Sequence, residues 1–375
     1  MESIKTMKEN HSGKTNYLTH NFHTYPAKYI PQIPRTFILE YTEQNDIVYD
    51  PFLGCGTTLV ECVLLNRNGI GVDSNPIATL ISESKTTKLK SKEILEISKF
   101  ISEIESSKED NFYSKYDHLN ITKFDNKDHW FQLIVQIELS FIKQKINQLT
   151  NKNVKTFLFV CFSSIIVEVS NQESDTRYAA KNKNIANFKT IEIFVKRGLS
   201  MVERIKEFSL EKGGSEILIK TQSSENVEFI DSNSVDLVIT SPPYANTYDY
   251  YLYHKSRMNW LQFDVKEVQK TEIGSRDKHS SKKLPIDNFI SSLMSCFREV
   301  YRVLKPGKHA VIVIGDSVIR GELFNAKEFT TKIFNDFNMD LVDFSSQNLK
   351  ENTRMFNPTI TNSLKNEHVL IFKKK

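Results

Sequence analysis

The chain has 375 residues, enough for one large or two medium domains, and its 39% hydrophobic and 26% charged content is that of a soluble globular protein. No apolar run approaches the roughly 20 residues that span a membrane, and the polar N-terminal stretch excludes a secretory signal. The net charge of +4 permits a nucleic-acid partner, and four cysteines without disulfide or zinc spacing predict a reduced, cytoplasmic protein with no metal site.

The first structured part of the chain alternates between strand and helix patterns. Residues 46–50 (DIVYD) predict a short strand, and the glycine-bearing turn PFLGCGTT follows it. Residues 59–67 (LVECVLLNR) have apolar positions at helical spacing, and residues 70–73 (IGVD) predict a second strand. This alternation favours a parallel α/β sheet.

The middle of the chain, from about residue 85 to 213, has a different character. It is rich in Lys, Glu, Ser and Asn, and it predicts helices most clearly over 92–105, 131–149 and 154–169. Residues 170–184 (SNQESDTRYAAKNKN) read as a polar loop. We therefore expect a helical insertion here.

The α/β pattern resumes after this insertion. Strands are predicted over 216–220 (EILIK), 235–240 (VDLVIT), 309–316 (HAVIVIGD), 339–346 and 367–375, and helices over 289–304 and 326–337. The polar, basic stretch 262–285 predicts a mobile loop.

The turn DPFLGCGTT has the features of a nucleotide site. Gly54 and Gly56 allow a tight turn and the close approach of a ligand, and Asp73, about 20 residues on, is placed to accept the hydroxyls of a ribose. No GxxxxGK[ST] motif is present, and Asp50 would repel a pyrophosphate. A cationic ligand, such as the ammonium of a methionine moiety, fits Asp50 better.

The stretch ITSPPYANTYDYY interrupts an apolar strand with two prolines, which cannot continue a sheet ladder. The carbonyls around Pro242 and Pro243 are therefore free to accept hydrogen bonds from a ligand, Ser241 adds a hydroxyl, and Tyr244 adds an aromatic face. Two acceptors beside an aromatic ring suit the exocyclic amine of a base.

Together, DPFLGCGTT and TSPPY resemble the amino-group DNA methyltransferases that use S-adenosylmethionine. Residues 20–38 are similar to the N-terminal cofactor motif of that family, 298–316 to its fifth-strand region and 366–374 to its last strand. The resemblance implies a Rossmann-like α/β fold, with a mainly parallel seven-stranded sheet, an antiparallel last strand and a helical insertion. The catalytic domain would comprise residues 1–84 and 216–375, and residues 85–215 would be the target-recognition region.

The resemblance also implies roles for individual residues. A flipped base would stack on Tyr244, and its amine would donate to Ser241 and to the carbonyl of Pro242. The catalytic set is Ser241, Pro242, Pro243 and Tyr244. The cofactor set is Tyr25, Pro26, Asp50, Pro51, Phe52, Gly54, Gly56, Thr57, Thr58, Asp73, Ser74, Asn75, Pro76, Gln222 and Ser223. The candidate DNA contacts are Asp175, Arg177, Tyr178, Arg276 and Lys278.

In this family Ser at the first position of the catalytic motif is typical of cytosine-N4 enzymes, and Asp or Asn is commoner in adenine-N6 enzymes. Ser241 therefore favours a site-specific methyltransferase that acts on N4 of cytosine in double-stranded DNA, in restriction–modification, with a cognate endonuclease as a candidate partner and no membrane. The alternatives are an adenine-N6 enzyme, an RNA amino-group methyltransferase and a catalytically silent specificity subunit. Cytosine-C5 chemistry fits poorly, because no Pro–Cys dipeptide supplies a nucleophilic thiolate.

Overall fold

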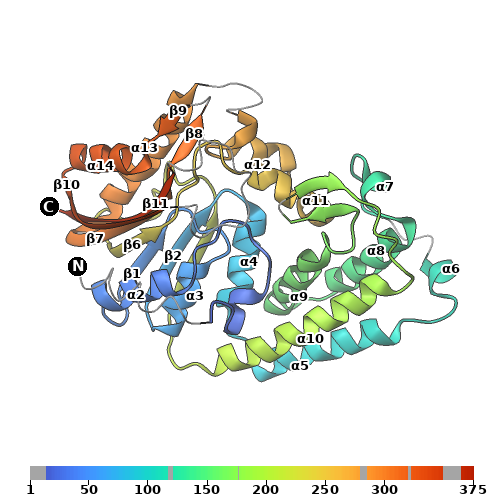
Figure 1. Ribbon diagram of the computed structural model, residues 1–375. Coiled ribbons are helices and arrows are strands. Elements are labelled where there is room, and N and C mark those ends of the chain that lie inside the picture. The colour runs from blue at the N-terminus through green and yellow to red at the C-terminus, as the bar shows by residue number, and fades with distance from the viewer. Residues whose placement is uncertain (1–13, 117–120, 176, 279–284, 320–321, 349–364) are drawn as a thin grey trace.

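The computed structural model describes residues 14–116, 121–175, 177–278, 285–319, 322–348 and 365–375. Its centre is a seven-stranded sheet with the order β10-β11-β7-β6-β1-β2-β5 (Figure 1). The strands are β1 (Ile47–Asp50), β2 (Asn68–Asp73), β5 (Ile217–Thr221), β6 (Val235–Thr240), β7 (Leu304–Gly315), β10 (Met339–Asn348) and β11 (Asn366–Lys374).

Strand directions confirm the predicted fold class. β5, β2, β1, β6 and β7 pair in parallel, whereas β11 runs antiparallel to both β7 and β10. The last strand is therefore the antiparallel one, and it lies between two earlier strands. β1 and β6 are neighbours at the centre, so the segments that follow them emerge at the same edge of the sheet.

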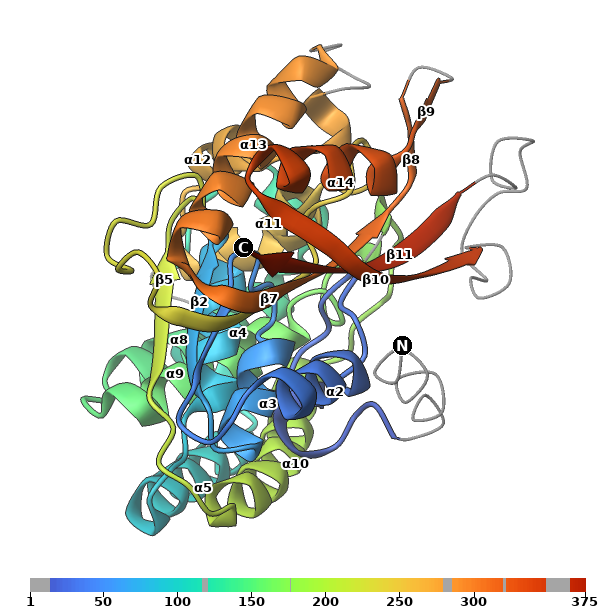
Figure 2. The same ribbon diagram turned by 90° about the vertical axis from the view of Figure 1, so that its left-hand side faces the viewer.

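Helices cover both faces of the sheet because side chains alternate along its strands. Val238 of β6 packs with α13 (Ile286–Val303) and α14 (Ala326–Asp336), whereas Leu237 and Ile239 pack with α2 (Gln32–Tyr41) and α3 (Thr57–Leu64). Figure 2 shows these two helix pairs on opposite sides of the sheet. Such double coverage explains why β6 is buried along its whole length.

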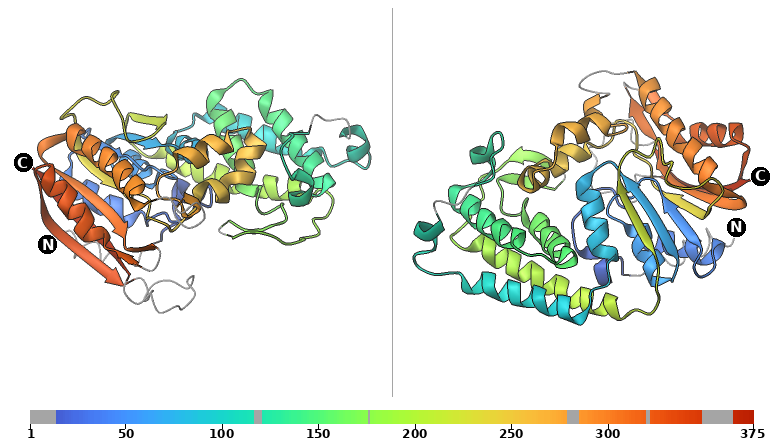
Figure 3. Two further views of the ribbon diagram at one scale, coloured as in Figure 1. Left: turned by 90° about the horizontal axis from the view of Figure 1, so that it is seen from above. Right: turned by 180° about the vertical axis from the view of Figure 1, so that it is seen from behind.

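The predicted middle of the chain is mostly helical, and its helices share a hydrophobic core with α4 (Pro76–Thr86), which packs against β2 and β5 (Figure 3). The short helix η2 (Leu18–Asn21) precedes the sheet. The helices after α4 are α5 (Ser91–Ser106), α6 (Phe112–Tyr116), α7 (Lys127–Trp130), α8 (Leu133–Asn147), α9 (Lys152–Ile165), α10 (Lys189–Leu210), α11 (Tyr250–Leu261) and α12 (Val265–Thr271). The target-recognition role of residues 85–215 stays a prediction.

Two segments expected as loops contain regular structure. Within the first, residues 170–184, β3 (Gln172–Ser174) pairs antiparallel with β4 (Arg177–Ala180). A similar pair, β8 (Ser317–Ile319) and β9 (Glu322–Phe324), lies in a stretch for which no element was predicted. The stretch 262–285 contains α12, which the side chain of Asp264 caps by accepting from two backbone N–H groups. Local capping and tertiary packing prevail over polar composition in both cases. Residues 279–284 of that stretch lie outside the described residues.

Candidate functional site

The glycine turn connects the end of β1 to the start of α3. Gly54 and Gly56 both have left-handed backbone angles, with φ of 51° and 75°. A side chain at Gly56 would also collide with α4, since its Cβ would lie 2.6 Å from Ser82 Oγ. Backbone conformation therefore requires both glycines, and the close packing of the turn on α4 also requires Gly56.

Helix α4 holds this turn through two side chains that the sequence did not single out. Ser82 Oγ donates to the carbonyl of Gly54 at 3.1 Å, and Lys85 Nζ donates to the carbonyl of Cys55 at 2.7 Å. Lys85 is buried, and desolvation lowers its pKa to about 8. Its burial is consistent with a structural role in fixing the turn.

Asp50 is the centre of a saturated hydrogen-bond cluster. Its carboxylate accepts from the hydroxyl of Thr58 at 2.6 Å, the hydroxyl of Thr240 at 2.6 Å, the N–H of Phe52 and the hydroxyl of Tyr29. Only 1% of Asp50 is exposed, and it does not line the pocket described below. The geometry thus gives Asp50 the task of holding the turn, in place of the expected contact with a ligand ammonium.

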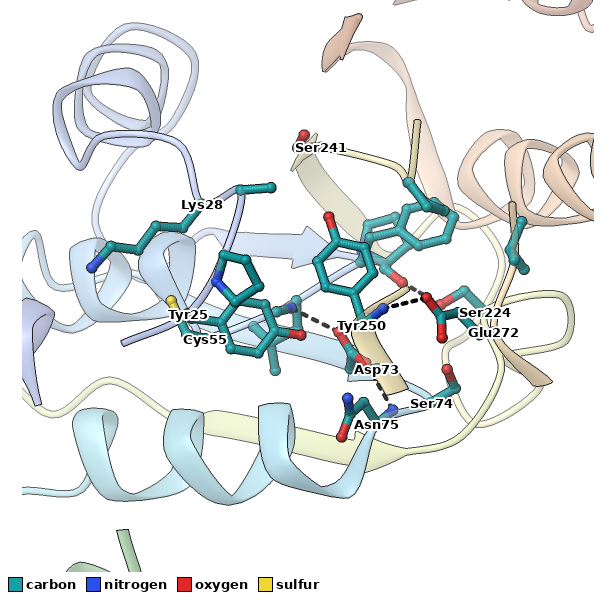
Figure 4. Close-up of a pocket in the computed structure, with 18 of the residues that line it drawn as sticks. Tyr25, Lys28, Cys55, Asp73, Ser74, Asn75, Ser224, Ser241, Tyr250 and Glu272 are labelled. Atoms are coloured by element: carbon teal, nitrogen blue, oxygen red, sulfur yellow. Dashed lines mark hydrogen bonds between the residues drawn. The ribbon is translucent and has the colours of Figure 1, made fainter. Parts of the chain in front are cut away.

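A pocket lies beside the turn at the carboxyl edge of the sheet, and it encloses about 920 Å³ of space, part of which is open to solvent. Figure 4 shows Tyr25, Asp73 and Tyr250 around this space. Predicted residues in its lining are Tyr25, Pro26, Pro51, Phe52, Gly54, Thr57, Asp73, Ser74, Asn75, Ser223, Ser241 and Pro243. The other predicted cofactor and catalytic residues, which are absent from the lining, are Asp50, Gly56, Thr58, Pro76, Gln222, Pro242 and Tyr244.

Asp73 and Asn75 have the chemistry that an adenosine group requires. Each oxygen of Asp73 accepts one backbone N–H, from Gly54 and from Asn75, both at 2.8 Å, which leaves a further lone pair on each for ribose hydroxyls. The amide nitrogen of Asn75 is buried without a partner among the described residues, so it can donate to a purine nitrogen. Burial raises the pKa of Asp73 to about 6.

The SPPY segment, predicted to be catalytic, begins where β6 ends, and its residues lie at different depths. Ser241 and Pro243 line the pocket, whereas Tyr244 lies beside it and donates from its hydroxyl to Glu367 of β11 at 2.8 Å. The Tyr244 ring packs on Gly315 of β7, where a Cβ would lie 2.6 Å from Tyr244 Cε2. Burial, together with Glu367, raises the pKa of Tyr244 well above its ordinary value.

Sequence reasoning expected part of the tyrosine run after the SPPY motif to line the pocket, but it missed Glu272. Tyr250, at the first turn of α11, and Glu272, just after α12, both line the pocket (Figure 4). Glu272 is buried and accepts the backbone N–H groups of Tyr250 and Tyr251 at 2.7 and 3.0 Å, and desolvation raises its pKa to about 8. Tyrosines after the SPPY motif were a visible signal, but nothing in the sequence indicated that Glu272 would be buried.

The predicted DNA contacts lie in two places. Asp175 binds Arg257 of α11, Arg177 binds Glu173 at 3.1 Å, and the Tyr178 ring lies 4.4 Å from that of Trp130. These three residues belong to the β3–β4 hairpin or its turn.

Arg276 and Lys278 lie instead near the pocket wall formed after α12. Arg276 Nε is 3.4 Å from a carboxylate oxygen of Asp249, and Lys278 Nζ donates to the carbonyls of Lys270 and Glu272. The pocket lies at the carboxyl edge of the sheet, where the glycine turn after β1 and the segment after β6 meet. This arrangement is that of a Rossmann-like site of the methyltransferase type.

The chain belongs to the DNA methylase family, whose model matches residues 3–84 and 235–375, more than half of the sequence. This family confirms S-adenosylmethionine as the cofactor. Residues 85–234, which include the helical middle, lie outside the match. Among the described residues, no helix has the length and apolarity needed to cross a membrane.

Several type II methyltransferases are similar to this chain. M.MvaI of Kocuria varians is 34% identical over a region that covers 70% of this chain and 61% of that protein. M.MjaII of Methanocaldococcus jannaschii is 26% identical over a region that covers 79% of this chain and 72% of that protein. The chain thus spans about three fifths to three quarters of the length of these relatives. Among solved structures, a SAM-dependent methyltransferase of Methanosarcina mazei is 11% identical, with a TM-score of 0.36. The matched region covers 94% of this chain and 98% of that chain.

Proposed function

We propose that this protein transfers a methyl group from S-adenosylmethionine to the exocyclic N4 amine of cytosine in double-stranded DNA, as the modification enzyme of a restriction–modification system. The observation that carries the proposal is the position of Ser241. Ser241 directly follows the central strand β6 and lines the cofactor pocket, and Tyr244 lies three residues further along the chain. A serine here, in the family to which the chain belongs, favours cytosine-N4 over adenine-N6, which is the second candidate.

In this proposal, residues of the chain bind and orient the cofactor and exchange hydrogen bonds with it. Asp73 would accept the ribose hydroxyls, Asn75 would donate to the adenine, and Ser223 would lie near the adenine edge, while the bound cofactor supplies the electrophilic methyl group. Tyr25 and Pro26 would line the methionine end. Asp50, Gly56 and Thr58 would act through the shape of the turn, and Pro76 and Gln222 would act from outside the pocket wall.

At the other end of the pocket, Ser241 Oγ, which lies in the lining, and the carbonyl of Pro242, which is not part of the lining, would accept the two amine protons of the target base. That contact would favour the tetrahedral geometry in which the nitrogen lone pair can attack, and it would stabilise the positive charge that develops on the nitrogen. Tyr244, fixed by Glu367 and Gly315, would stack on the flipped base. The product proton can leave to water, so no general base is required.

The test is nucleoside mass spectrometry. The purified protein is incubated with unmethylated plasmid and S-adenosylmethionine, and the digested DNA is searched for methylated bases. N4-methylcytosine is the expected product. N6-methyladenine would support methyl transfer to DNA but refute cytosine as the target base. Methyl transfer to tRNA alone would refute DNA as the substrate.

A matched pair of variants then tests the assigned roles. Ser241→Ala should retain cofactor binding and lose most methyl transfer, whereas Ser223→Ala should weaken cofactor binding more than it slows the transfer step. Full activity of both Ser241→Ala and Tyr244→Ala would overturn the catalytic assignment.

A further inference from the structure

Helix α11 lies between the catalytic motif and the β3–β4 hairpin. It begins at Tyr250, six residues after Tyr244, and Tyr250 lines the cofactor pocket. The hairpin belongs to a distant stretch of sequence, yet it packs against α11 (Figure 1). One helix therefore contacts both the pocket and the hairpin.

Three consecutive residues of α11 reach the hairpin. Lys255 Nζ lies 5.8 Å from the centre of the Tyr178 ring, Ser256 Oγ is 3.3 Å from the amide oxygen of Gln172, and Arg257 Nη2 donates to Asp175 Oδ1. These three contacts connect α11 to both strands of the hairpin and to the turn between them.

Arg257 is the strongest of these contacts because it is buried. Only 1% of its side chain is exposed, against 28% for that of Asp175, and its other partners are neutral: the carbonyls of Ser163 and Tyr253 and a ring nitrogen of His254. Asp175 is the carboxylate that neutralises it. A buried guanidinium that loses its counter-charge is costly, so the structure strongly favours the docked hairpin.

The same arginine is connected to the cofactor pocket. Arg257 Nη1 is 3.4 Å from His254 Nδ1, and the His254 ring stacks on Tyr25 with centres 4.9 Å apart. Tyr25 in turn lines the pocket and lies against Gly54 of the glycine turn. The hairpin is therefore connected to the pocket through side chains in direct contact, of which Arg257 and His254 are buried.

Strand β4 and the segment that follows it are basic, although the Lys183 ammonium already donates to the carbonyls of Val167 and Glu168. Residues 177–189 contain Arg177, Lys181, Lys183 and Lys189 and no acidic residue, and the Tyr178 ring packs beside Trp130. Glu173, bound to Arg177, is the nearest acid within the hairpin strands, and Lys189 pairs with Glu192. Arg177 and Lys181 are exposed. Clustered cations beside aromatic side chains are typical of surfaces that bind nucleic-acid phosphates.

We propose that the β3–β4 hairpin contacts the DNA target and that Arg257, through Asp175, is the positioning residue that sets the hairpin against the catalytic motif. This inference rests on the proposed function, because it takes DNA as the substrate. It also reassigns Asp175 from a DNA contact to an anchor, and it leaves Arg177 and Lys181 as the contacts.

The first test compares two acids of the same hairpin. Asp175→Asn removes the partner of the buried Arg257, whereas the control, Glu173→Gln, removes the partner of the exposed Arg177. We expect Asp175→Asn to raise the KM for DNA about tenfold and to increase methylation at non-cognate sites, with kcat and the Kd for S-adenosylmethionine within about twofold of wild type. Glu173→Gln frees Arg177 of a competing carboxylate, so it should leave kcat and the cofactor Kd unchanged and should not raise the KM for DNA or non-cognate methylation. Asp175→Glu should recover the KM at least in part.

The result that would overturn the anchor is an unchanged KM for DNA in Asp175→Asn. An equal fall in kcat, cofactor affinity and thermal stability would also overturn it, because that pattern reports a general loss of structure. If the wild-type protein binds S-adenosylmethionine but modifies no DNA, the proposed function fails first, and the hairpin assignment fails with it.

The second test concerns the contact itself. Arg177→Ala with Lys181→Ala should weaken binding to an unmodified duplex and lower the slope of log Kd against log salt by about one to two. Lys206→Ala, on the exposed side of α10, is the matched control and should change neither. A double variant with wild-type affinity and salt slope would remove the hairpin from the DNA interface.

Discussion

Thr240 Oγ1 donates to Asp50 Oδ1 over 2.6 Å, and this bond ties the end of β6 to the end of β1. The residue after Asp50 begins the glycine turn, and the residue after Thr240 is Ser241 of the catalytic motif. The glycine turn and the SPPY segment are thus fixed to each other by a hydrogen bond between buried side chains.

This bond can be removed with Thr240→Val, which keeps the shape of the side chain. Asp50 would lose one of its donors in a buried position, so the free energy of unfolding should fall by about 1–2 kcal/mol. The Kd for S-adenosylmethionine should rise as well, since the turn loses its tie to β6. Denaturant titration and calorimetry measure the two effects, and a variant that matches wild type in both would show that the bond contributes nothing.

Gly315→Ala should separate chemistry from cofactor binding. A Cβ at this position would lie 2.6 Å from Tyr244 Cε2, so the ring must move away from its present place. We expect kcat to fall by about 10- to 100-fold, because a displacement near 1 Å at a reacting centre is costly, with the cofactor Kd unchanged. Gly307→Ala, at an open position of the same strand with a φ of 76°, controls for glycine replacement and should lower stability alone.

Cofactor affinity should depend on the ionisation of Asp73. Burial raises its pKa to about 6, and the ionised carboxylate is the form that accepts two ribose hydroxyls. The Kd for S-adenosylmethionine should therefore rise as the pH falls through about 6, and in Asp73→Asn it should be higher and lack this transition. Calorimetric titrations between pH 5 and 8 would test this, and a wild-type profile as flat as that of the variant would contradict it.

Glu272 predicts a pH dependence of stability. Its pKa in the folded protein is about 8, above the ordinary value of 4.5, so the folded state holds its proton more tightly than the unfolded state. The stability that this proton contributes is complete below about 4.5 and is lost as the pH rises through about 8.

Glu272→Gln resembles the protonated acid at every pH. Its Tm relative to wild type should therefore increase between pH 5 and 9, as thermal unfolding without ligand would measure. Glu267→Gln, on the exposed side of α12, should follow wild type across the range. A constant difference between Glu272→Gln and wild type would show that Glu272 is not buried as described.

The sequence predicted the sheet and the two motif loops because those signals are local. Strand residues such as Val238 and Val311 belong to short apolar runs, and the glycines of the turn are required by backbone angle. The hairpin around Asp175 and the burial of Glu272 could not be predicted, since both depend on partners far along the chain: Arg257 for the first and the backbone of Tyr250 for the second. The base that is methylated stays a prediction for the same reason, as it depends on the shape of a pocket assembled from several segments.

The bond between Glu367 and Tyr244 has a consequence for when the protein becomes active. Tyr244 is held by a strand formed by residues 366–374, whereas the cofactor turn lies near residue 54. During synthesis, the cofactor turn and the serine of the catalytic motif emerge from the ribosome well before the strand that fixes the tyrosine. If Tyr244 stacks on the target base as proposed, a nascent chain at that stage would lack an ordered platform for the base, and methylation would begin only after strand β11 has inserted between β7 and β10.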